Sequence, residues 1–185
     1  MKKFFKTLQM VAAATILTAG SVAAQSVMVG GAAMYPTKNI IENAVNSQDH
    51  TTLVAAVKAA GLVDALQGKG PFTVFAPDNK AFDKLPKGTV ETLVKPENKA
   101  TLTGILTYHV VSGKYDSKAL MSLIEKGNGM ASLKTLAGGT LMFKMKGKKK
   151  LIVVDEKGGE SEVTIADVYQ SNGVIHSVDT VLMPK

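Results

Sequence analysis

The chain has 185 residues and a formal net charge of +7 at pH 7, and it contains neither cysteine nor arginine. The absence of cysteine excludes disulfides, thiolate metal sites and a cysteine nucleophile. The absence of arginine argues against nucleic-acid recognition, because arginine supplies the bidentate contacts to phosphates and bases. We therefore expect no nucleic-acid partner, and a core that is held together by packing alone.

The first 24 residues have the three parts of a signal peptide. Lys2, Lys3 and Lys6 form a positive start, and the apolar stretch 8–19 carries no charge. The small residues of segment 21–24 (SVAA) predict cleavage after residue 24. The apolar stretch is shorter than the roughly 20 residues of a membrane span, which disfavours the alternative of an uncleaved anchor. We therefore expect no transmembrane anchor after cleavage.

The next part of the chain has a helical pattern. The uncharged segment 25–36 is predicted to be a short flexible lead or an edge segment. Beyond it, apolar residues recur with a helical period over 40–45 and again over 53–57. Gly61 is the expected end of the second helix, and Asp49 is the expected cap at its start.

A single early strand interrupts the helices. Residues 72–75 (FTVF) form a β-type run, and Asp78 stands where the next helix needs its N-cap. Pro96 opens a further helix, since a missing N–H costs nothing in the first turn. Residues 108–111 (YHVV) lead from that helix into a strand, and 116–127 form one more amphipathic helix.

After residue 129 the pattern changes to short alternating or β-branched runs separated by turn signals. Asn172-Gly173 is the strongest signal, because a two-residue hairpin turn favours residues that adopt positive φ at both positions. Helices first and strands later indicate an α+β domain rather than alternating βαβ units.

Three stretches of the chain carry a family signature. They are 72–82 (FTVFAPDNKAF), 108–111 (YHVV) and 172–184 (NGVIHSVDTVLMP). Together, in this order and spacing, they resemble the fasciclin domain family. The resemblance extends over nearly all of the chain beyond residue 36, so we expect residues 37–185 to form one fasciclin-like domain.

The resemblance implies a β-wedge or sandwich flanked by a layer of N-terminal helices. It also implies a secreted or cell-surface protein that acts in adhesion, with no enzymatic activity common to the family. Animal members bind integrins through an Asp-Ile pair near the C-terminal stretch. Residues 179–184 (DTVLMP) lack that pair, so an integrin partner is not supported.

The histidines of the signature stretches are expected to lie inside the domain. Both faces of strand 174–182 are largely apolar, which predicts that His176 is buried. An unpaired buried polar group costs about 1–3 kcal/mol, so we expect Asp78, Tyr108, His109 and His176 to take part in a polar network that ties the three stretches together. The full set of expected structural residues is Phe75, Pro77, Asp78, Tyr108, His109, His176 and Asp179.

A metal site formed by His109, His176 and either Asp78 or Asp179 is the sharper alternative. The spacing is not diagnostic of a metal, and on a strand His176 and Asp179 point to opposite faces. We therefore expect no metal and no cofactor. His50, beside an expected helix start, is predicted to be a surface residue.

Catalytic motifs are missing from the sequence. There is no Gly-x-Ser-x-Gly elbow, and the carboxylate pairs 155–156 and 160/162 are predicted to be solvated loop charges. We therefore expect that the protein is not an enzyme.

One region concentrates positive charge. Apolar and basic residues alternate toward a predicted basic hairpin tip, which suggests either a solvated edge that discourages aggregation or a weak, salt-sensitive contact to an anionic surface or acidic polysaccharide. The residues concerned are Lys144, Lys146, Lys148, Lys149 and Lys150.

The combined interpretation is an exported, non-catalytic interaction module, secreted or periplasmic. Its expected partner is a protein or polysaccharide at the cell surface or in the matrix. The alternative is a periplasmic protein that binds a small hydrophobic or anionic ligand between its helices and its wedge.

Overall fold

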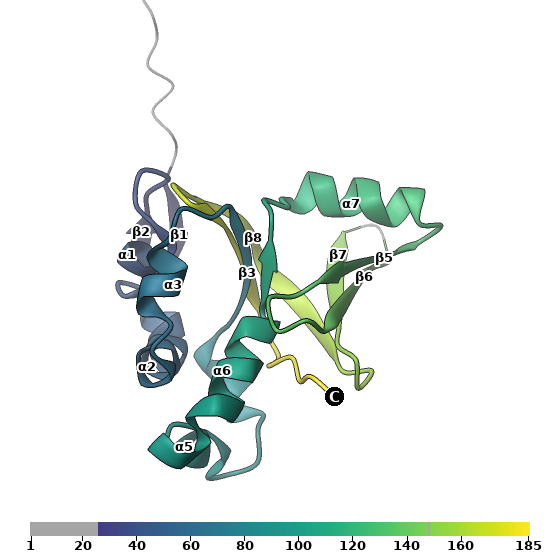
Figure 1. Cartoon of the computed structure of the whole chain (residues 1–185). Helices are drawn as coiled ribbons and strands as arrows, with labels where there is room; N and C mark the ends of the chain where they lie inside the picture. Colours follow the sequence, from purple (N-terminus) through teal and green to yellow (C-terminus); the bar gives the residue numbers. More distant parts are fainter. Residues whose placement is uncertain (1–25, 148) are drawn as a thin grey trace, which may run out of the picture.

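The computed structural model describes residues 26–147 and 149–185, which form two sheets with helices on either side (Figure 1). The small sheet pairs β1 with β2, and the large sheet has the order β4-β3-β9-β8-β7-β6-β5. The strands are β1 (Val27–Val29), β2 (Ala32–Met34), β3 (Phe72–Pro77), β4 (Val110–Ser112), β5 (Met130–Lys134), β6 (Thr140–Lys146), β7 (Lys150–Val154), β8 (Glu160–Gln170) and β9 (Gly173–Val178). The helices are α1 (Ile40–Ala44), η1 (Gln48–His50), α2 (Thr51–Ala60), α3 (Val63–Gln67), α4 (Asn79–Asp83), α5 (Thr89–Leu93), η2 (Pro96–Asn98), α6 (Lys99–Tyr108) and α7 (Ser117–Lys126).

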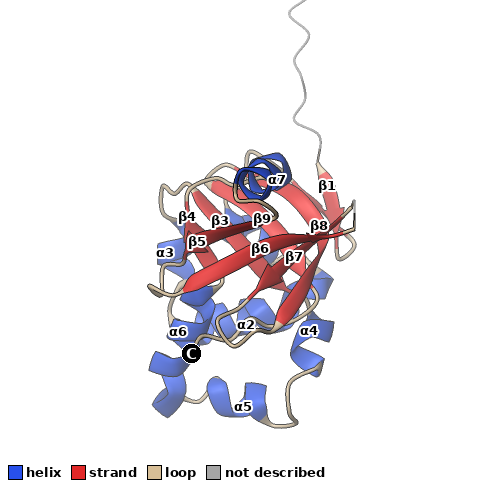
Figure 2. Cartoon of the chain, turned by 90° about the vertical axis from the view of Figure 1, so that its right-hand side faces the viewer, coloured by secondary structure: helices blue, strands red, loops and turns tan. Residues whose placement is uncertain are grey.

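The large sheet curls until its two ends meet. Strands β3 and β9 are parallel, and the other neighbours pair antiparallel. Figure 2 shows β5, β6 and β7 in front of β3 and β9. A bridge between Val111 and Thr135, and a 2.8 Å hydrogen bond from the Leu136 N–H to the Val110 carbonyl, join the two ends. The predicted α+β fold, a β-wedge flanked by N-terminal helices, is therefore confirmed.

Two apolar cores lie on opposite faces of β3 and β9. The first core packs α1, α2, α3 and α6 against one face, where β3 contributes Val74 and Ala76. The second core fills the inside of the curled sheet and lies under α7, where β3 contributes Phe75. Every residue of β9 is buried, as the apolar character of both its faces predicted. Within residues 26–147 and 149–185, no helix has the length and apolar character needed to span a membrane.

Local sequence signals explain several helix ends. Gly61 ends α2 in the left-handed conformation, with φ of +72°, and Asp78 caps α4 by accepting from the Ala81 N–H at 2.7 Å. Both predictions are confirmed. Asp116 caps α7 in the same way through the Ala119 N–H at 2.9 Å.

The predicted Asp49 cap is wrong, because a residue distant in sequence takes that place. Asp49 lies inside η1, which runs directly into α2. The Asn79 Oδ1 atom accepts from the Thr52 N–H at 3.1 Å, and the Asn79 side-chain amide donates to the Gln48 carbonyl at 2.8 Å. The start of α2 is therefore capped from α4.

Segment 25–36, predicted as a flexible lead or an edge segment, contains the β1–β2 hairpin. Gly30 and Gly31 both have positive φ, as a two-residue hairpin turn requires. The hairpin packs on the helical layer and buries Val29 and Met34 in the first core.

The hairpin predicted at Asn172-Gly173 exists, but its turn is placed differently. Gln170 pairs with Gly173, so the turn residues are Ser171 and Asn172. Neither of these two turn residues has a positive φ. Gly173 is needed for another reason: a Cβ atom there would lie 2.1 Å from the Phe72 carbonyl oxygen of β3.

Candidate functional site

Tyr108 fixes the end of α6 to the opposite side of the wedge. Its side chain is fully buried. The phenol donates to the Thr140 carbonyl at 2.9 Å and accepts from the Glu156 N–H at 3.0 Å. Tyr108 therefore joins α6, the start of β6 and the turn after β7.

His109 joins the same helix to the C-terminal segment. Its Nδ1 atom lies 2.8 Å from the Ile105 carbonyl, and its Nε2 atom accepts from the Leu182 N–H at 2.9 Å. Because the carbonyl can only accept and the amide can only donate, the ring is the neutral tautomer with its proton on Nδ1. Burial lowers the pKa of His109 to about 4.

His176 lies in the buried strand β9 and is also bonded to backbone groups on both ring nitrogens. Its Nε2–H donates to the Tyr115 carbonyl at 2.8 Å, and its Nδ1 atom accepts from the Asp167 N–H at 3.3 Å. The ring stacks on Phe75 with 5.5 Å between centroids. Burial lowers the pKa of this histidine as well.

The expected polar network does not form as one unit. None of the described hydrogen bonds joins the side chains of Asp78, Tyr108, His109 and His176 to one another, since each has its own backbone partners. The signature stretches are linked instead by the Phe75 N–H, which donates to the His109 carbonyl at 2.9 Å, and by the His109–Leu182 bond.

Asp179 directly follows the last residue of β9. Its carboxylate accepts from the Glu162 N–H at 2.8 Å and forms an ion pair with Lys84 at 3.1 Å. Among the described residues, no group of three or more His, Cys, Asp or Glu side chains is arranged to hold a metal ion.

The acidic pairs are not the solvated loop charges that we predicted. Asp155 is buried and accepts from the N–H groups of Gly159 at 2.7 Å and Met183 at 3.0 Å. It thus holds both the β7–β8 turn and the C-terminal segment. Its Oδ1 atom also accepts from the Lys157 N–H at 3.0 Å, two residues further on, which is an Asx-turn; this local hydrogen bond was not predicted from the sequence.

The basic hairpin forms between β6 and β7, as predicted. Lys144 pairs with Glu160, and Lys150 pairs with Glu162 at 2.8 Å, which places both glutamates on β8 rather than in a loop. Lys146 and Lys149 are exposed and form no salt bridge within the described part of the chain. Lys148 lies outside the described residues.

His50 is buried, which overturns its predicted surface position. Only 4% of the residue is exposed. One ring nitrogen lies 2.9 Å from the Ser47 Oγ atom, and the other lies 3.1 Å from the Ser177 Oγ atom on β9. The sequence gives no local signal for this Ser–His–Ser chain, because one of its serines is 127 residues away.

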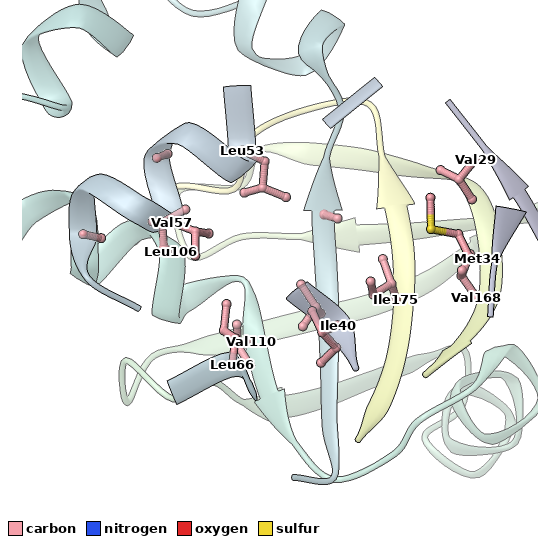
Figure 3. Packing of buried hydrophobic residues seen from close by; sticks show 14 of the residues in the cluster. Val29, Met34, Ile40, Leu53, Val57, Leu66, Leu106, Val110, Val168 and Ile175 are labelled. Carbon is pink, nitrogen blue, oxygen red and sulfur yellow. The ribbon is translucent and has the colours of Figure 1, made fainter. Parts of the chain in front are cut away.

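The Ser–His–Ser chain forms one wall of a cavity of about 150 Å³. The cavity lies in the first core, whose side chains Figure 3 shows between the helical layer and the β3–β9 pair. Apart from this polar wall its lining is mostly aliphatic, and its residues include Ile40, Leu53, Val57, Leu66, Leu106 and Ile175.

Comparison with known proteins agrees with the architecture. Residues 48–184 match the family model described as Fasciclin domain. The chain is 47% identical to Protein sll1483 of Synechocystis sp. over 161 residues, covering 86% of this chain and 81% of that protein. It is 35% identical to the immunogenic protein MPB70 of Mycobacterium bovis, covering 76% of this chain and 66% of that protein. A FAS1 domain pair from the insect cell adhesion molecule Fasciclin I superimposes with a TM-score of 0.71 at 18% identity, over 79% of this chain and 51% of that one. The chain belongs to the fasciclin domain family.

Proposed function

We propose that the protein is an exported, non-catalytic interaction module that binds an anionic partner at the cell surface or in the matrix. The observation that carries this proposal is the fasciclin match over residues 48–184. Two similar proteins support it: one is a cell surface glycolipoprotein of Mycobacterium bovis, MPB83, and the other is the insect adhesion molecule.

Burial of the signature residues directs partner binding to the outer surface. Phe75, Tyr108, His109 and His176 are each at most 2% exposed, so a macromolecular partner cannot touch them in the folded domain. Their role in this proposal is to hold the wedge together, while exposed side chains make the contact.

The basic hairpin is the surface that we assign to an anionic partner. Lys146 and Lys149 are exposed near its tip, beside the paired Lys144 and Lys150. Glu160 and Glu162 offset part of the charge, so the contact is weak and salt-sensitive. An acidic polysaccharide presents the repeated charges that such a surface selects.

Replacing Lys146 and Lys149 by glutamine should reduce retention of the protein on an immobilised acidic polysaccharide at low salt. The matched control is Lys87→Gln with Lys95→Gln, which removes the same charge from exposed positions around α5. We expect the hairpin variant to elute at clearly lower salt than the parent, and the control to elute close to it. Equal elution of the two variants would show that only net charge matters, and would reject the hairpin as the contact.

Export predicts a defined N-terminus. When the full gene product is expressed in a bacterial host with a general secretion system, the mass of the protein in the exported fraction should correspond to residues 25–185. Ala24→Leu should block this cleavage, because the enzyme requires a small residue there. Exported protein that retains residues 1–24 would contradict the proposed signal peptide.

A further inference from the structure

The cavity in the first core has a wall suited to an apolar ligand. Aliphatic side chains from α1, α2, α3, α6 and β9 face it. Interiors of folded proteins are normally packed with few voids larger than a water molecule, and an empty space of this kind is destabilising. The cavity therefore needs an explanation beyond ordinary packing.

The size and polarity of the cavity limit the kind of molecule that can bind in it. A hydrocarbon-lined cavity of about 150 Å³ stays dry and accepts a molecule such as benzene, and the cavity has this volume. Among the described residues, Lys58 is the only charged side chain that lines it, and it is exposed on α2. A neutral molecule about as large as one aromatic ring fits these conditions.

The Ser–His–Ser chain adds one specific hydrogen bond. Burial lowers the pKa of His50, so its ring is neutral near pH 7 and carries one N–H and one lone pair. One serine accepts from the ring N–H, and the other serine donates to the ring lone pair. The accepting serine then has its own O–H left over, and none of the described hydrogen bonds assigns an acceptor to that proton.

We propose that this cavity is a binding site for a compact, neutral, ring-sized apolar molecule that carries one hydrogen-bond acceptor, such as a phenol or a cyclic ketone. The ring lies against the aliphatic wall, and its oxygen accepts the remaining serine proton. The half-buried side chains of Ile41, Val54 and Leu62, from α1, α2 and the start of α3, also line the cavity. This site is independent of the basic hairpin.

Binding is tested on the exported protein with phenol, cyclohexanone and toluene as probes, by methyl NMR. Phenol and cyclohexanone should give saturable shifts of the Leu53, Leu66 and Ile175 methyl groups. Toluene should bind roughly five-fold more weakly, because it lacks the acceptor for a hydrogen bond of about 1 kcal/mol. The absence of saturable shifts with all three probes would overturn the site.

Variants test the apolar lining and the serine–histidine chain one at a time. Val57→Phe fills the cavity and Ala44→Leu adds bulk to its wall on α1, so each should abolish or strongly weaken binding of every probe. Of the two variants Ser47→Ala and Ser177→Ala, the one that removes the accepting serine should bring the affinities for phenol and toluene close together, whereas Ser161→Ala, a buried serine outside the cavity, should leave their ratio unchanged. If the ratio in both Ser47→Ala and Ser177→Ala equals that of the parent, the serine–histidine chain does not select the ligand.

Discussion

Mild acid should weaken the fold, with the loss beginning below pH 6.5. The pKa of His109 is lowered by burial to about 4, against 6.5 for a free histidine. Between these values the unfolded chain takes up a proton that the folded chain excludes, so the free energy of unfolding decreases as the pH falls. At pH 4.5 this one residue should remove roughly 2–3 kcal/mol.

His50 and His176 act in the same direction, because burial lowers the pKa of each. Carboxyl groups change the free energy of unfolding at lower pH than the histidines do. The hydrogen bond from the Ala119 N–H, for example, lowers the pKa of Asp116 from 3.8, so the stability that this group contributes is lost below about pH 5. The loss between pH 6.5 and about pH 5 therefore reports the histidines.

Urea unfolding followed by circular dichroism at pH 7.5, 6.5, 5.5 and 4.5 measures this effect. The free energy of unfolding should be nearly constant above pH 7 and fall steadily below pH 6.5. In His109→Gln, the amide oxygen keeps an acceptor near the Leu182 N–H but cannot be protonated, so the decrease should be smaller by about 2 kcal/mol at pH 4.5. A parent protein equally stable at pH 7.5 and pH 4.5 would contradict neutral burial of these rings.

Sequence reasoning succeeded where the cause was local. Gly61 ends α2 because glycine readily adopts the left-handed conformation found after the last turn of a helix. Asp78 caps α4 because its carboxylate accepts from the backbone N–H three residues later. The burial of β9 followed from the apolar character of both its faces. These rules depend on neighbouring residues alone, and the family resemblance added the expectation of a β-wedge flanked by N-terminal helices.

The same reasoning failed where the partner is far away along the chain. Asp49 and His50 were judged from their position before α2, but Asn79 caps that helix and Ser177 binds the histidine. Asp155 was judged a loop charge, although the Met183 N–H near the C-terminus needs it as an acceptor. A polar side chain therefore shows its burial only after the distant backbone groups that it satisfies are known.

The existence and size of the cavity could not be predicted from any pattern in the sequence, although the alternative interpretation placed a small-ligand site between the helices and the wedge. The helical period over 40–45 predicted an apolar face for α1, but not how much of the space beside that face other side chains fill. The apolar residues that line the cavity all read as ordinary core residues. Whether such residues fill the space between the helices and the sheet is decided by packing in three dimensions.

Replacing His176 by alanine should cause a large loss of stability. The ring is fully buried, stacks on Phe75, and satisfies the Tyr115 carbonyl and the Asp167 N–H. The variant creates a cavity and leaves two backbone groups without their partner, so we expect a cost of about 3–4 kcal/mol. For a domain of this size the melting temperature should fall by roughly 10 °C.

Two further variants identify the cause of that loss. Lys118→Ala, on the exposed face of α7, should change the free energy of unfolding by less than about 0.5 kcal/mol. His176→Asn keeps an acceptor close to the position of Nδ1, so it should recover part of the loss through the Asp167 N–H. A His176→Ala protein that melts within about one degree of the parent, where roughly 10 °C is expected, would show that this ring does not support the wedge. The assignment of the signature residues to the interior framework, and of binding to other surfaces, would then have to be abandoned.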